Sequence, residues 1–317
     1  MRVLITGVAG FIGSHMAEKL VELGYQVTGI DNFSDYYNVS LKRQNAEILR
    51  KKGVEVLEKD LRNPEDYEDI TQDFNFVFHF AGRPGISASS SFDDYFSNNV
   101  YATELLLNFS LKNKNLKHFF NIGTSSIYGR EATYTETEVP RPVSNYGVSK
   151  LAAEQLALSL ARSEKIKASS LRLYSVYGPR ERPDKLYTKL IQCAYNEEEF
   201  PLFEGSEEHL RSFTYVGDIV DGIVRALENY EKLNTQIINL GSEEEFSTSN
   251  GIQFIEEILE KKIKIKHLPR RAGDQLRTRA KIEKARELIG YDPKISLFEG
   301  LGKQVEWYKE FMMPQIS

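Results

Sequence analysis

Short apolar segments alternate with longer amphipathic segments through the first half of the chain. The apolar segments are rich in β-branched and aromatic residues, and they are Arg2–Thr6, Tyr25–Ile30, Val54–Glu58, Phe76–Phe80, Phe119–Ile122 and Lys167–Leu173. Nearly continuous apolar runs are typical of strands that are buried on both faces. The pattern therefore predicts an α/β fold, a doubly wound parallel sheet with helices on both sides.

The alternation breaks after Tyr174, where Pro179, Pro183 and Pro201 interrupt the chain and a helix is expected near Leu186–Tyr195. We interpret this part as a smaller C-terminal α/β lobe that faces the substrate. In a parallel sheet of this kind, ligands bind beyond the carboxyl ends of the strands.

The chain is expected to return to the sheet with a helix after Asp218 and a strand at Ile237–Leu240. The two domains are thus interleaved. The cofactor-binding domain is predicted to comprise residues 1–173 and about 212–241, and the substrate lobe residues 174–211 and 242–317.

Composition excludes several classes of protein. The 317 residues, 41% of them hydrophobic, can bury a sizeable core, and the net charge of −5 is spread without the basic stripe that nucleic acid requires. The single cysteine, Cys193, excludes an intrachain disulfide and a Cys-based zinc site, and we expect it to be a buried residue on a helix. No apolar run reaches membrane-spanning length, so we expect no membrane partner and a cytoplasmic location. We also expect no metal and no nucleic-acid partner.

A glycine-rich segment, Thr6-Gly7-Val8-Ala9-Gly10-Phe11-Ile12-Gly13, lies between the first strand and an amphipathic segment at Ser14–Leu23. Gly7 permits a tight turn, Gly10 lets a pyrophosphate approach the backbone, and Gly13 allows close helix packing. The helix N-terminus offers unpaired N–H groups to the anion. A phosphate-binding loop is therefore predicted, although the same glycines could merely close a turn.

Two acidic positions follow the second and third strands. Asp31, followed by Asn32, can accept hydrogen bonds from both hydroxyls of a ribose but would repel a 2′-phosphate, which favours NAD over NADP. Asp60 and Leu61 are placed to meet the adenine, but Asp60 is equally compatible with an ordinary turn or cap.

Tyr146 and Lys150 are four residues apart at the start of an amphipathic segment, so they share one helix face. A free tyrosine titrates near pH 10 and is a poor base. A nearby ammonium and a positively charged nicotinamide would lower the Tyr146 pKa towards the working range. Alone, such a pair is more often a surface pair, but together with the glycine loop it indicates a catalytic base.

The glycine loop and the Tyr-x-x-x-Lys pair, in this order and separation, resemble the short-chain dehydrogenase/reductase family. The form Thr-Gly-x-x-Gly-x-x-Gly and the additional lobe resemble its extended branch of nucleotide-sugar epimerases and dehydratases, which implies a Rossmann-like fold and NAD. The segments 78–82, 99–103 and 124–129 match further motifs of this branch, with Ala102 in place of the usual glycine. The resemblance assigns Thr124, Tyr146 and Lys150 to catalysis. It assigns to NAD the residues Gly7, Gly10, Phe11, Ile12, Gly13, Asp31, Asn32, Asp60, Leu61, Phe80, Ala81, Gly82, Asn99, Tyr146, Lys150 and Tyr174.

Ser125 and Ser126 bear on the reaction type. Family members that dehydrate the sugar resemble Thr-Asp-Glu here and those that decarboxylate it Thr-Ser-Glu, whereas this chain has Thr-Ser-Ser. Two hydroxyls do not readily supply the acid and base that elimination needs. The resemblance therefore implies a 4-epimerase, which removes a hydride at C4′ and returns it to the opposite face.

The stretch 171–184 resembles that of UDP-glucuronate 4-epimerases, which interconvert UDP-glucuronate and UDP-galacturonate. Ser175 stands where many neutral-sugar epimerases have asparagine, and Arg182 matches an arginine that meets the substrate carboxylate, although by itself it could be a surface-loop residue. The substrate site implied by the resemblance consists of Arg83, Ser125, Ser126, Ser175, Arg182, Arg211, Arg271 and Asp274. Arg211 and Arg271 would bind the UDP diphosphate. Residues 83–87 and 279–281 depart from the family pattern. The resemblance therefore specifies the reaction more closely than it specifies the sugar.

Three alternatives stay open. The same machinery would serve UDP-glucose and UDP-galactose or their N-acetylhexosamine relatives; a UDP-glucuronate decarboxylase would need a glutamate at Ser126; and a non-catalytic NAD-binding protein would usually have lost Tyr146 or Lys150. Family members commonly dimerise through the helices at Tyr101–Leu111 and Tyr146–Leu160, so a homodimer is expected, although core packing also explains the apolar faces of these helices.

Overall fold

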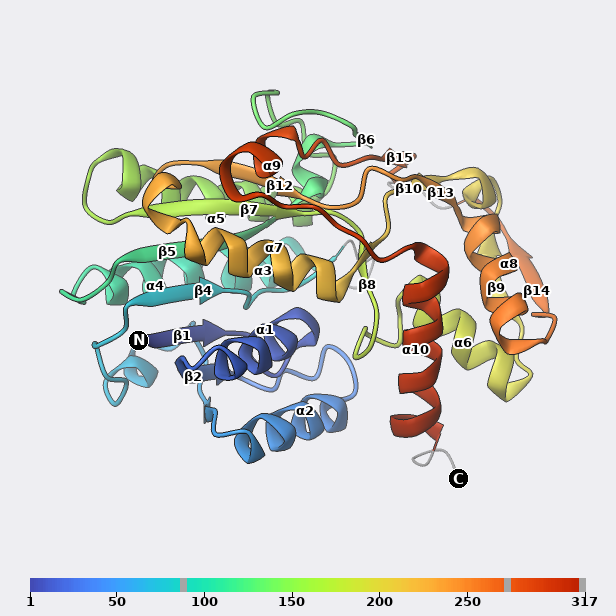
Figure 1. The fold of residues 1–317 in the computed structure, drawn as a ribbon, viewed down its shortest axis with the longest axis horizontal. Helices are drawn as coiled ribbons and strands as arrows, with labels where there is room; N and C mark the ends of the chain where they lie inside the picture. The colour runs from blue at the N-terminus through green and yellow to red at the C-terminus, as the bar shows by residue number, and fades with distance from the viewer. Residues whose placement is uncertain (86–89, 271–274, 314–317) are drawn as a thin grey trace.

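A seven-stranded parallel sheet forms the centre of the molecule (Figure 1). The computed structural model describes residues 1–85, 90–270 and 275–313. The strands of this sheet are β1 (Arg2–Thr6), β2 (Gln26–Asp31), β3 (Glu55–Glu58), β4 (Phe76–His79), β5 (His118–Thr124), β7 (Ala168–Leu173) and β12 (Ile237–Leu240). Their order is β12-β7-β5-β4-β1-β2-β3, and every neighbouring pair is parallel. The predicted α/β, Rossmann-like fold is confirmed.

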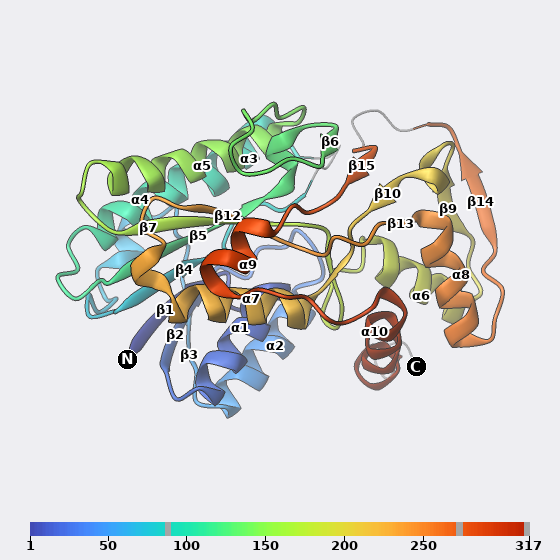
Figure 2. The same cartoon turned by 45° about the horizontal axis from the view of Figure 1, so that its top comes forward.

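Helices cover both faces of the sheet (Figure 2). One face carries α1 (Phe11–Glu22), α2 (Val39–Lys51) and α7 (Val216–Glu228); the other carries α3 (Phe92–Tyr95), the π-helix η2 (Phe96–Tyr101), α4 (Ala102–Ser110) and α5 (Asn145–Arg162). Each layer has its own apolar core, with Met16, Leu20 and Ile223 on the first face and Leu106, Phe109 and Ala157 on the second. The sheet is therefore buried on both sides, as its apolar strands require.

A smaller lobe lies beside the sheet (Figure 1, right). It contains α6 (Leu186–Asn196), β9 (Phe200–Phe203), α8 (Thr248–Leu259), β14 (Ile265–Leu268) and α10 (Leu297–Phe311). These elements share a third core, which includes Leu190, Ile255 and Leu301. Cys193 is buried in this core on α6, as predicted.

Shorter elements complete the structure. They are β6 (Glu131–Ala132), β8 (Val176–Tyr177), β10 (Leu210–Arg211), β11 (Thr214–Tyr215), β13 (Phe246–Ser247), β15 (Arg277–Thr278), α9 (Glu283–Ile289) and the 3-10 turns η1 (Pro64–Tyr67), η3 (Ser125–Tyr128), η4 (Ser206–Glu208) and η5 (Tyr230–Lys232). The chain returns to the sheet through α7 and β12, but α7 begins at Val216 rather than after Asp218. Asp218 lies in its first turn, where a carboxylate interacts favourably with the helix dipole.

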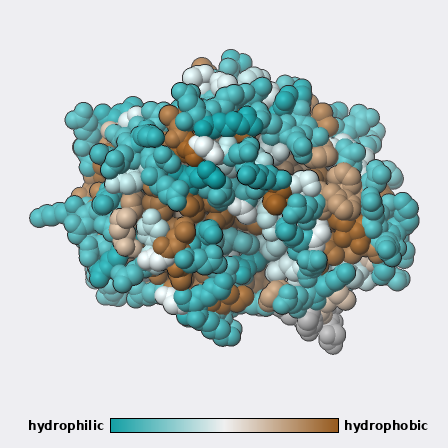
Figure 3. Space-filling model, viewed as in Figure 1, coloured by the Kyte–Doolittle hydropathy of each residue, from teal (hydrophilic) through white to brown (hydrophobic). Residues whose placement is uncertain are grey.

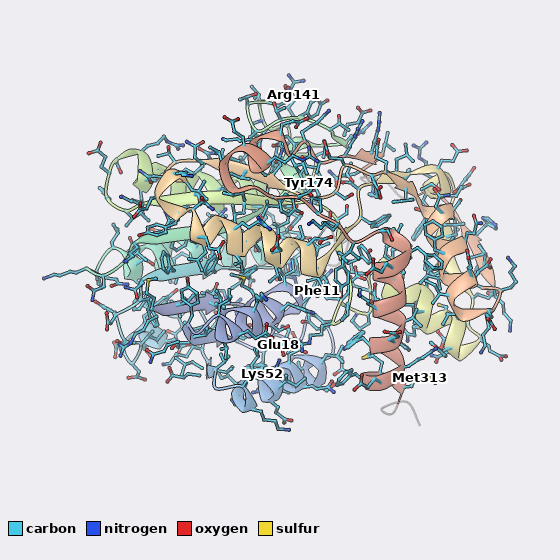
Figure 4. The ribbon with its side chains drawn as sticks, viewed as in Figure 1. Phe11, Glu18, Lys52, Arg141, Tyr174 and Met313 are labelled. Atoms are coloured by element: carbon cyan, nitrogen blue, oxygen red, sulfur yellow. The ribbon has the colours of Figure 1, made fainter. Side chains whose placement is uncertain are left out.

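A polar contact on α1 ties the two parts together. Arg180, in the loop after β8, donates to both carboxylate oxygens of Glu18 at 3.0 and 3.1 Å and to Ser14 Oγ at 3.2 Å. Lys52, at the end of α2, reaches the same Glu18 at 3.1 Å, and Figure 4 shows these two side chains between α1 and α2. This contact fixes one end of the loop that carries residues 180–185.

The surface is mostly hydrophilic on the face drawn in Figure 3, where hydrophobic residues form small groups. Among the described residues, no helix combines the length and apolar character needed to cross a membrane.

Two glycines of α10 allow a matched test of how this helix packs. A Cβ at Gly300 would lie 2.1 Å from Tyr177 Oη, whereas a Cβ at Gly302 would meet nothing within 4 Å. We expect Gly300→Ala to lower the free energy of unfolding by about 1–3 kcal/mol through overpacking. Gly302→Ala should raise it by about 0.5–1 kcal/mol because alanine is the better helix former. Urea unfolding would measure both, and equal effects would contradict this packing.

Candidate active site

One large cavity opens at the carboxyl ends of the parallel strands, between the sheet and the smaller lobe. Its volume is about 700 Å³, and its wall contains residues from β2, β5 and β7, from the segments that follow β1 and β4, and from α6, β9 and β10. Most of the predicted site residues lie in this wall: Gly7, Gly10, Phe11, Ile12, Gly13, Asp31, Asn32, Asp60, Leu61, Phe80, Ala81, Gly82, Arg83, Thr124, Ser125, Ser126, Tyr146, Lys150, Ser175, Arg182 and Arg211. A cavity in this position is where an open α/β sheet binds its ligand.

The glycine loop has no room for side chains at two of its three glycines. Gly7 has φ +69° and a Cβ there would lie 2.8 Å from the backbone nitrogen of Ala81, while a Cβ at Gly13 would lie 2.3 Å from the Gly7 carbonyl oxygen. A Cβ at Gly10 would meet only the Gly7 carbonyl, at 3.1 Å, so its outer side is open. The loop thus presents bare backbone at the N-terminus of α1, as a phosphate-binding loop requires.

Asp31 ends β2 and faces the same cavity. Its carboxylate accepts hydrogen bonds from the backbone N–H groups of Ala9 (3.1 Å) and Phe33 (2.9 Å), which fix its orientation. Burial raises the pKa of Asp31, while Lys42 and the two backbone donors act in the opposite direction. A carboxylate held in this way has lone pairs left for two vicinal hydroxyls, so the residues fit the adenosine half of NAD.

Asp60 is engaged by neighbouring residues. Its carboxylate accepts from Asn32 Nδ2 at 3.1 Å and from the Arg62 guanidinium at 2.6–3.2 Å, and these contacts lower its pKa to about 2. Asp60 therefore anchors the floor of the cavity beside Leu61, which agrees with the turn role that the sequence left open.

Tyr146 enters the cavity from the first turn of α5, whose N-cap is Ser144. Its hydroxyl is hydrogen-bonded to Thr124 and to the backbone of Gly85. Thr124 ends β5, where its Oγ1 accepts from the backbone N–H of Ser126 at 3.2 Å and lies 3.3 Å from Ser126 Oγ. The structure thus brings the predicted Tyr146 and Thr124 together from segments that are distant in the sequence.

The groups of the chain alone raise the pKa of Tyr146, which the sequence predicted to be lowered. Burial raises this pKa, and the hydrogen bond with Thr124 and the charge of Arg182 offset only part of the increase. Lys150, one turn later, is also buried, and its pKa falls to about 8, with Glu154 opposing the shift. A cationic ring bound in the cavity would add the positive charge that favours the phenolate.

Arg172 and Glu154 form a buried ion pair near Lys150. Arg172 donates to both oxygens of Glu154 at 2.9 and 2.7 Å, and both side chains are 1% exposed. Arg172 also donates to Tyr128 Oη at 2.7 Å, and Ser170 Oγ donates to Glu154 at 2.9 Å. Glu154 is therefore fully engaged on the face of α5 that carries Lys150.

Asn99 lies behind the cavity wall rather than in it. Its Nδ2 donates to Ser149 Oγ at 2.9 Å and to the Arg83 carbonyl at 3.2 Å, and its Oδ1 accepts from the Arg83 backbone N–H at 2.6 Å. The neighbouring Asn98 lines the cavity. Asn99 thus joins the loop after β4 to α5, because the π-helix η2 turns its side chain inward.

Tyr174 is the second predicted cofactor residue that does not line the cavity. It is fully buried against Gly241 and lies near Tyr128, with ring centroids 6.4 Å apart. Its neighbours Leu173 and Ser175 line the cavity, whereas Tyr174 itself is directed into the core.

Arg182 is buried in the cavity wall, and its charge acts on Tyr146. Its Nε and Nη2 donate to the two oxygens of Asp184 at 2.9 Å each, and its Nη1 lies 3.3 Å from the Pro84 carbonyl. The guanidinium carbons of Arg182 and Arg83 lie 5.0 and 4.0 Å from the centroid of the Tyr36 ring. The guanidinium therefore faces the cavity with one of its two hydrogen-bonding edges already occupied.

Two further predicted substrate residues, Ser175 and Arg211, lie in the cavity wall. Ser175 adopts φ +31° between β7 and β8 and lies 3.5 Å from Thr278 Oγ1. Arg211 donates to the Gln275 carbonyl. Arg271 and Asp274 fall outside the described residues.

Several cavity residues were not predicted from the sequence. They include Ser34, Tyr36, Tyr37, Lys42, Glu181, Asp184, Lys185, Phe200, Phe203 and His209. Lys42 lies on α2, eleven residues after Asp31, and donates to the carbonyl and hydroxyl oxygens of Ser34 at 2.9 and 3.0 Å, so the packing of α2 brings its charge to the cavity. Aromatic and basic residues directly after the second strand were the available signal.

The chain is similar to characterised and solved proteins over nearly its whole length. Residues 3–241 match the NAD dependent epimerase/dehydratase family. A UDP-glucuronate 4-epimerase of Thermodesulfobacterium geofontis is 33% identical over 314 residues, which cover 97% of this chain and 96% of the relative. A Bacillus subtilis protein named as an uncharacterized UDP-glucose epimerase is 33% identical over 312 residues, which cover 97% and 98%. The crystal structure of a Bacillus cereus UDP-glucuronic acid 4-epimerase with UDP-glucuronic acid and NAD matches with TM-score 0.92 and 34% identity, and the match covers 98% and 99%.

The buried ion pair behind Lys150 gives a stability prediction. Arg172→Met leaves Glu154 buried without its cation, and we expect the free energy of unfolding to fall by about 3–5 kcal/mol. Replacing both partners, Glu154→Met with Arg172→Met, should recover about 2 kcal/mol or more because no uncompensated charge remains. A double variant as unstable as the single one in urea would argue against this charge pairing.

Proposed function

The chain belongs to the NAD-dependent epimerase/dehydratase family, and from this we propose that it is a UDP-glucuronate 4-epimerase, interconverting UDP-glucuronate and UDP-galacturonate. The observation that carries the proposal is one cavity whose wall contains Tyr146 and Thr124 together with Ser126 and Arg182. The first pair suits removal of a proton from a sugar hydroxyl. The second pair suits recognition of a carboxylate.

The cofactor in this proposal is NAD, held by the glycine loop and Asp31. Bound NAD⁺ accepts the hydride from C4′ of the sugar and later returns it to the opposite face of the resulting 4-keto sugar. Tyr146 accepts the O4′ proton and gives it back in the second half of the reaction, so no proton is gained or lost overall. Thr124 orients the hydroxyl, and Lys150 favours the ionised form of Tyr146.

The carboxylate of the sugar needs firm placement because a 4-keto uronate is a β-keto acid that can lose CO₂. Ser125, Ser126 and Ser175 can donate hydrogen bonds to it, and Arg182 can add a charge-assisted one through Nη1 or by exchange with Asp184. Holding the carboxylate away from alignment with the carbonyl suppresses decarboxylation. Arg211 is proposed to bind the diphosphate, as is Arg271, and Asp274 completes the proposed substrate set.

One observation favours the neighbouring activity on UDP-glucose and UDP-galactose. Arg182 already forms a bidentate ion pair with Asp184, so its charge is balanced before any sugar carboxylate arrives. A neutral sugar would then bind without disturbing this pair. Measuring conversion of both substrates with the same protein distinguishes the two activities.

We further propose that the chain divides its tasks between residues 1–173 with 212–241, which hold NAD, and the remaining residues, which hold the UDP-sugar. A homodimer is proposed through the α4 and α5 faces, supported by exposed Phe92, Phe96, Tyr101 and Val148 on α3, η2 and α5. A cytoplasmic location is part of the same proposal.

Epimerisation is tested with purified protein, UDP-glucuronate and no added NAD, following the sugar protons by NMR. We expect UDP-galacturonate to form, and Tyr146→Phe to lower kcat about 10²- to 10⁴-fold because the general base is lost. Tyr134→Phe, a change at an exposed tyrosine outside the cavity, should keep the wild-type rate. Conversion of UDP-galactose alone would favour the neutral-sugar epimerase, and inertness towards both substrates would refute the proposed enzyme.

Cofactor preference is a second consequence of the proposal. Asp31 would stand against the 2′-phosphate of NADP, and like charges in contact cost several kcal/mol. We expect NAD to bind at least about 100-fold more tightly than NADP. Asp31→Asn should lower the ratio of the affinity for NAD to that for NADP. Equilibrium dialysis of cofactor-free protein measures the ratio, and equal binding of the two cofactors would remove Asp31 from the proposed role.

A further inference from the structure

Arg180 is a largely buried arginine that the proposed mechanism does not use. It belongs to residues 178–185 between β8 and α6, a segment that we call the Arg182 loop because it carries the arginine proposed to meet the sugar carboxylate. The side chain of Arg180 is 13% exposed and lines not the main cavity but a small second one, with Asn45 of α2 and Trp307 of α10. Arg180 and Arg182 thus leave the same loop for different surroundings.

The backbone of Arg180 has a conformation that an arginine rarely adopts. Its φ is +68°, and Gly178, two residues earlier, has φ +137°. A residue with a Cβ is disfavoured in the left-handed region, so it persists there only where its surroundings hold it. The side chain of Arg180 supplies such a contact, because Nη1 and Nη2 donate to the two carboxylate oxygens of Glu18 at 3.0 and 3.1 Å. The ion pair therefore holds the loop in a shape that the backbone alone disfavours.

Glu18 is a firmly held partner on α1, the helix whose N-terminus opens into the main cavity. Its side chain is 14% exposed, and Lys52 lies 3.1 Å from one of its oxygens. Burial raises the pKa of Glu18, but the hydrogen bonds and charges of Arg180 and Lys52 outweigh burial and leave this pKa below its usual value. Arg180 Nη1 also donates to Ser14 Oγ on α1 at 3.2 Å. Glu18 is thus ionised near neutral pH, and the pair is a charge-assisted contact.

The Arg182 loop is attached to two different parts of the molecule. Gln304 of α10 donates to Glu181 at 2.9 Å and so attaches the loop to the smaller lobe. Arg180 attaches it to α1, which covers the sheet. Arg182 itself reaches the Pro84 carbonyl, on the sheet side, at 3.3 Å. Loss of the Arg180 contact would therefore make the position of Arg182 follow the smaller lobe.

A uronate would need both parts of the molecule at a fixed separation. Its carboxylate is carried by C5′, which is bonded to C4′, the carbon of the reacting hydroxyl. In the proposed mechanism that hydroxyl meets Tyr146 of α5, on the sheet side, while the carboxylate meets Arg182 of the loop. Because the two groups of the sugar are on adjacent carbons, a small displacement of Arg182 relative to Tyr146 would prevent both contacts from forming together.

We propose that Arg180 is a positioning residue: its ion pair with Glu18 fixes the place of Arg182 relative to Tyr146 and thereby supports binding of the sugar part of the substrate. This rests on the proposed function, because it assigns the sugar carboxylate to Arg182. The UDP part is proposed to bind elsewhere, at Arg211, and its binding does not depend on the ion pair.

The test compares a ligand that has the sugar with one that lacks it, so that effects on the UDP site cancel. Dissociation constants of UDP-glucuronate and UDP are measured by isothermal titration calorimetry on NAD-saturated Tyr146→Phe protein, in which turnover is suppressed. Glu18→Gln and Arg180→Gln in this background should each raise the ratio of the UDP-glucuronate constant to the UDP constant about tenfold, the change that loss of one charge-assisted hydrogen bond represents. The double variant should raise the ratio no further, because the two side chains form one contact.

Lys52→Met is the matched control. It removes the other cation bound to Glu18, 3.1 Å away, but Lys52 follows α2 and is not part of the Arg182 loop. The ratio should therefore stay at its starting value. A general loss of structure would weaken UDP and UDP-glucuronate by the same factor. That result, or an equal rise of the ratio in Lys52→Met, would overturn the proposal, and so would effects of Glu18→Gln and Arg180→Gln that add in the double variant.

A further variant keeps the test informative if Arg180→Gln does not fold. Arg180→Gly also removes the ion pair, but glycine adopts φ +68° without steric cost. The ratio should rise in this variant as well, and an unchanged ratio counts against Arg180. Failure of the proposed function is recognised separately. In that case the wild-type protein does not convert UDP-glucuronate, whereas failure of this inference leaves the conversion intact and the ratio unmoved by the variants.

Discussion

The cavity depends on the close approach of three backbone segments around Gly7. The Gly7 and Val8 N–H groups donate to the Ile30 carbonyl at the end of β2, and a Cβ on Gly7 would collide with the backbone of Ala81 after β4. This approach brings the ends of β1, β2 and β4 to one point. Asp31, the glycine loop and the segment towards Arg83 then share a single wall, and the N-terminus of α1 opens into it.

Burial shifts the pKa values of Tyr146 and Lys150, which lie in another part of the cavity wall. Tyr146 and Lys150 are withdrawn from water, so the pKa of the phenol rises and that of the amine falls to about 8. Both shifts favour the uncharged forms. The chain compensates with charges that it keeps in place, namely Arg182 near Tyr146 and the Glu154–Arg172 pair behind Lys150. A positively charged ligand ring would complete the balance, which suits a site that works only with its cofactor bound.

The loop after β8 brings further charged groups to the cavity. Arg182 and Lys185 are held near Gly85, Arg182 is paired with Asp184, and burial raises the pKa of the neighbouring Glu181. The loop that carries these groups is fastened to both parts of the molecule, through Arg180 to Glu18 and through Glu181 to Gln304. The packing of the smaller lobe therefore helps to fix this part of the cavity wall.

The sequence by itself determined what depends on local spacing: the parallel strands, the glycine loop at a strand-to-helix junction, Asp31 at a strand end, and Tyr146 with Lys150 one turn apart. The tertiary structure alone decided what depends on distant partners. Asn99 turns inward to Ser149, Tyr174 packs against Gly241, and Arg182 Nη1 lies 3.3 Å from the carbonyl of Pro84. Lys42 and Glu181 reach the cavity for the same reason. Periodicity records which face of an element is apolar, whereas hydrogen-bond partners and burial are fixed only when elements far apart in the chain pack together.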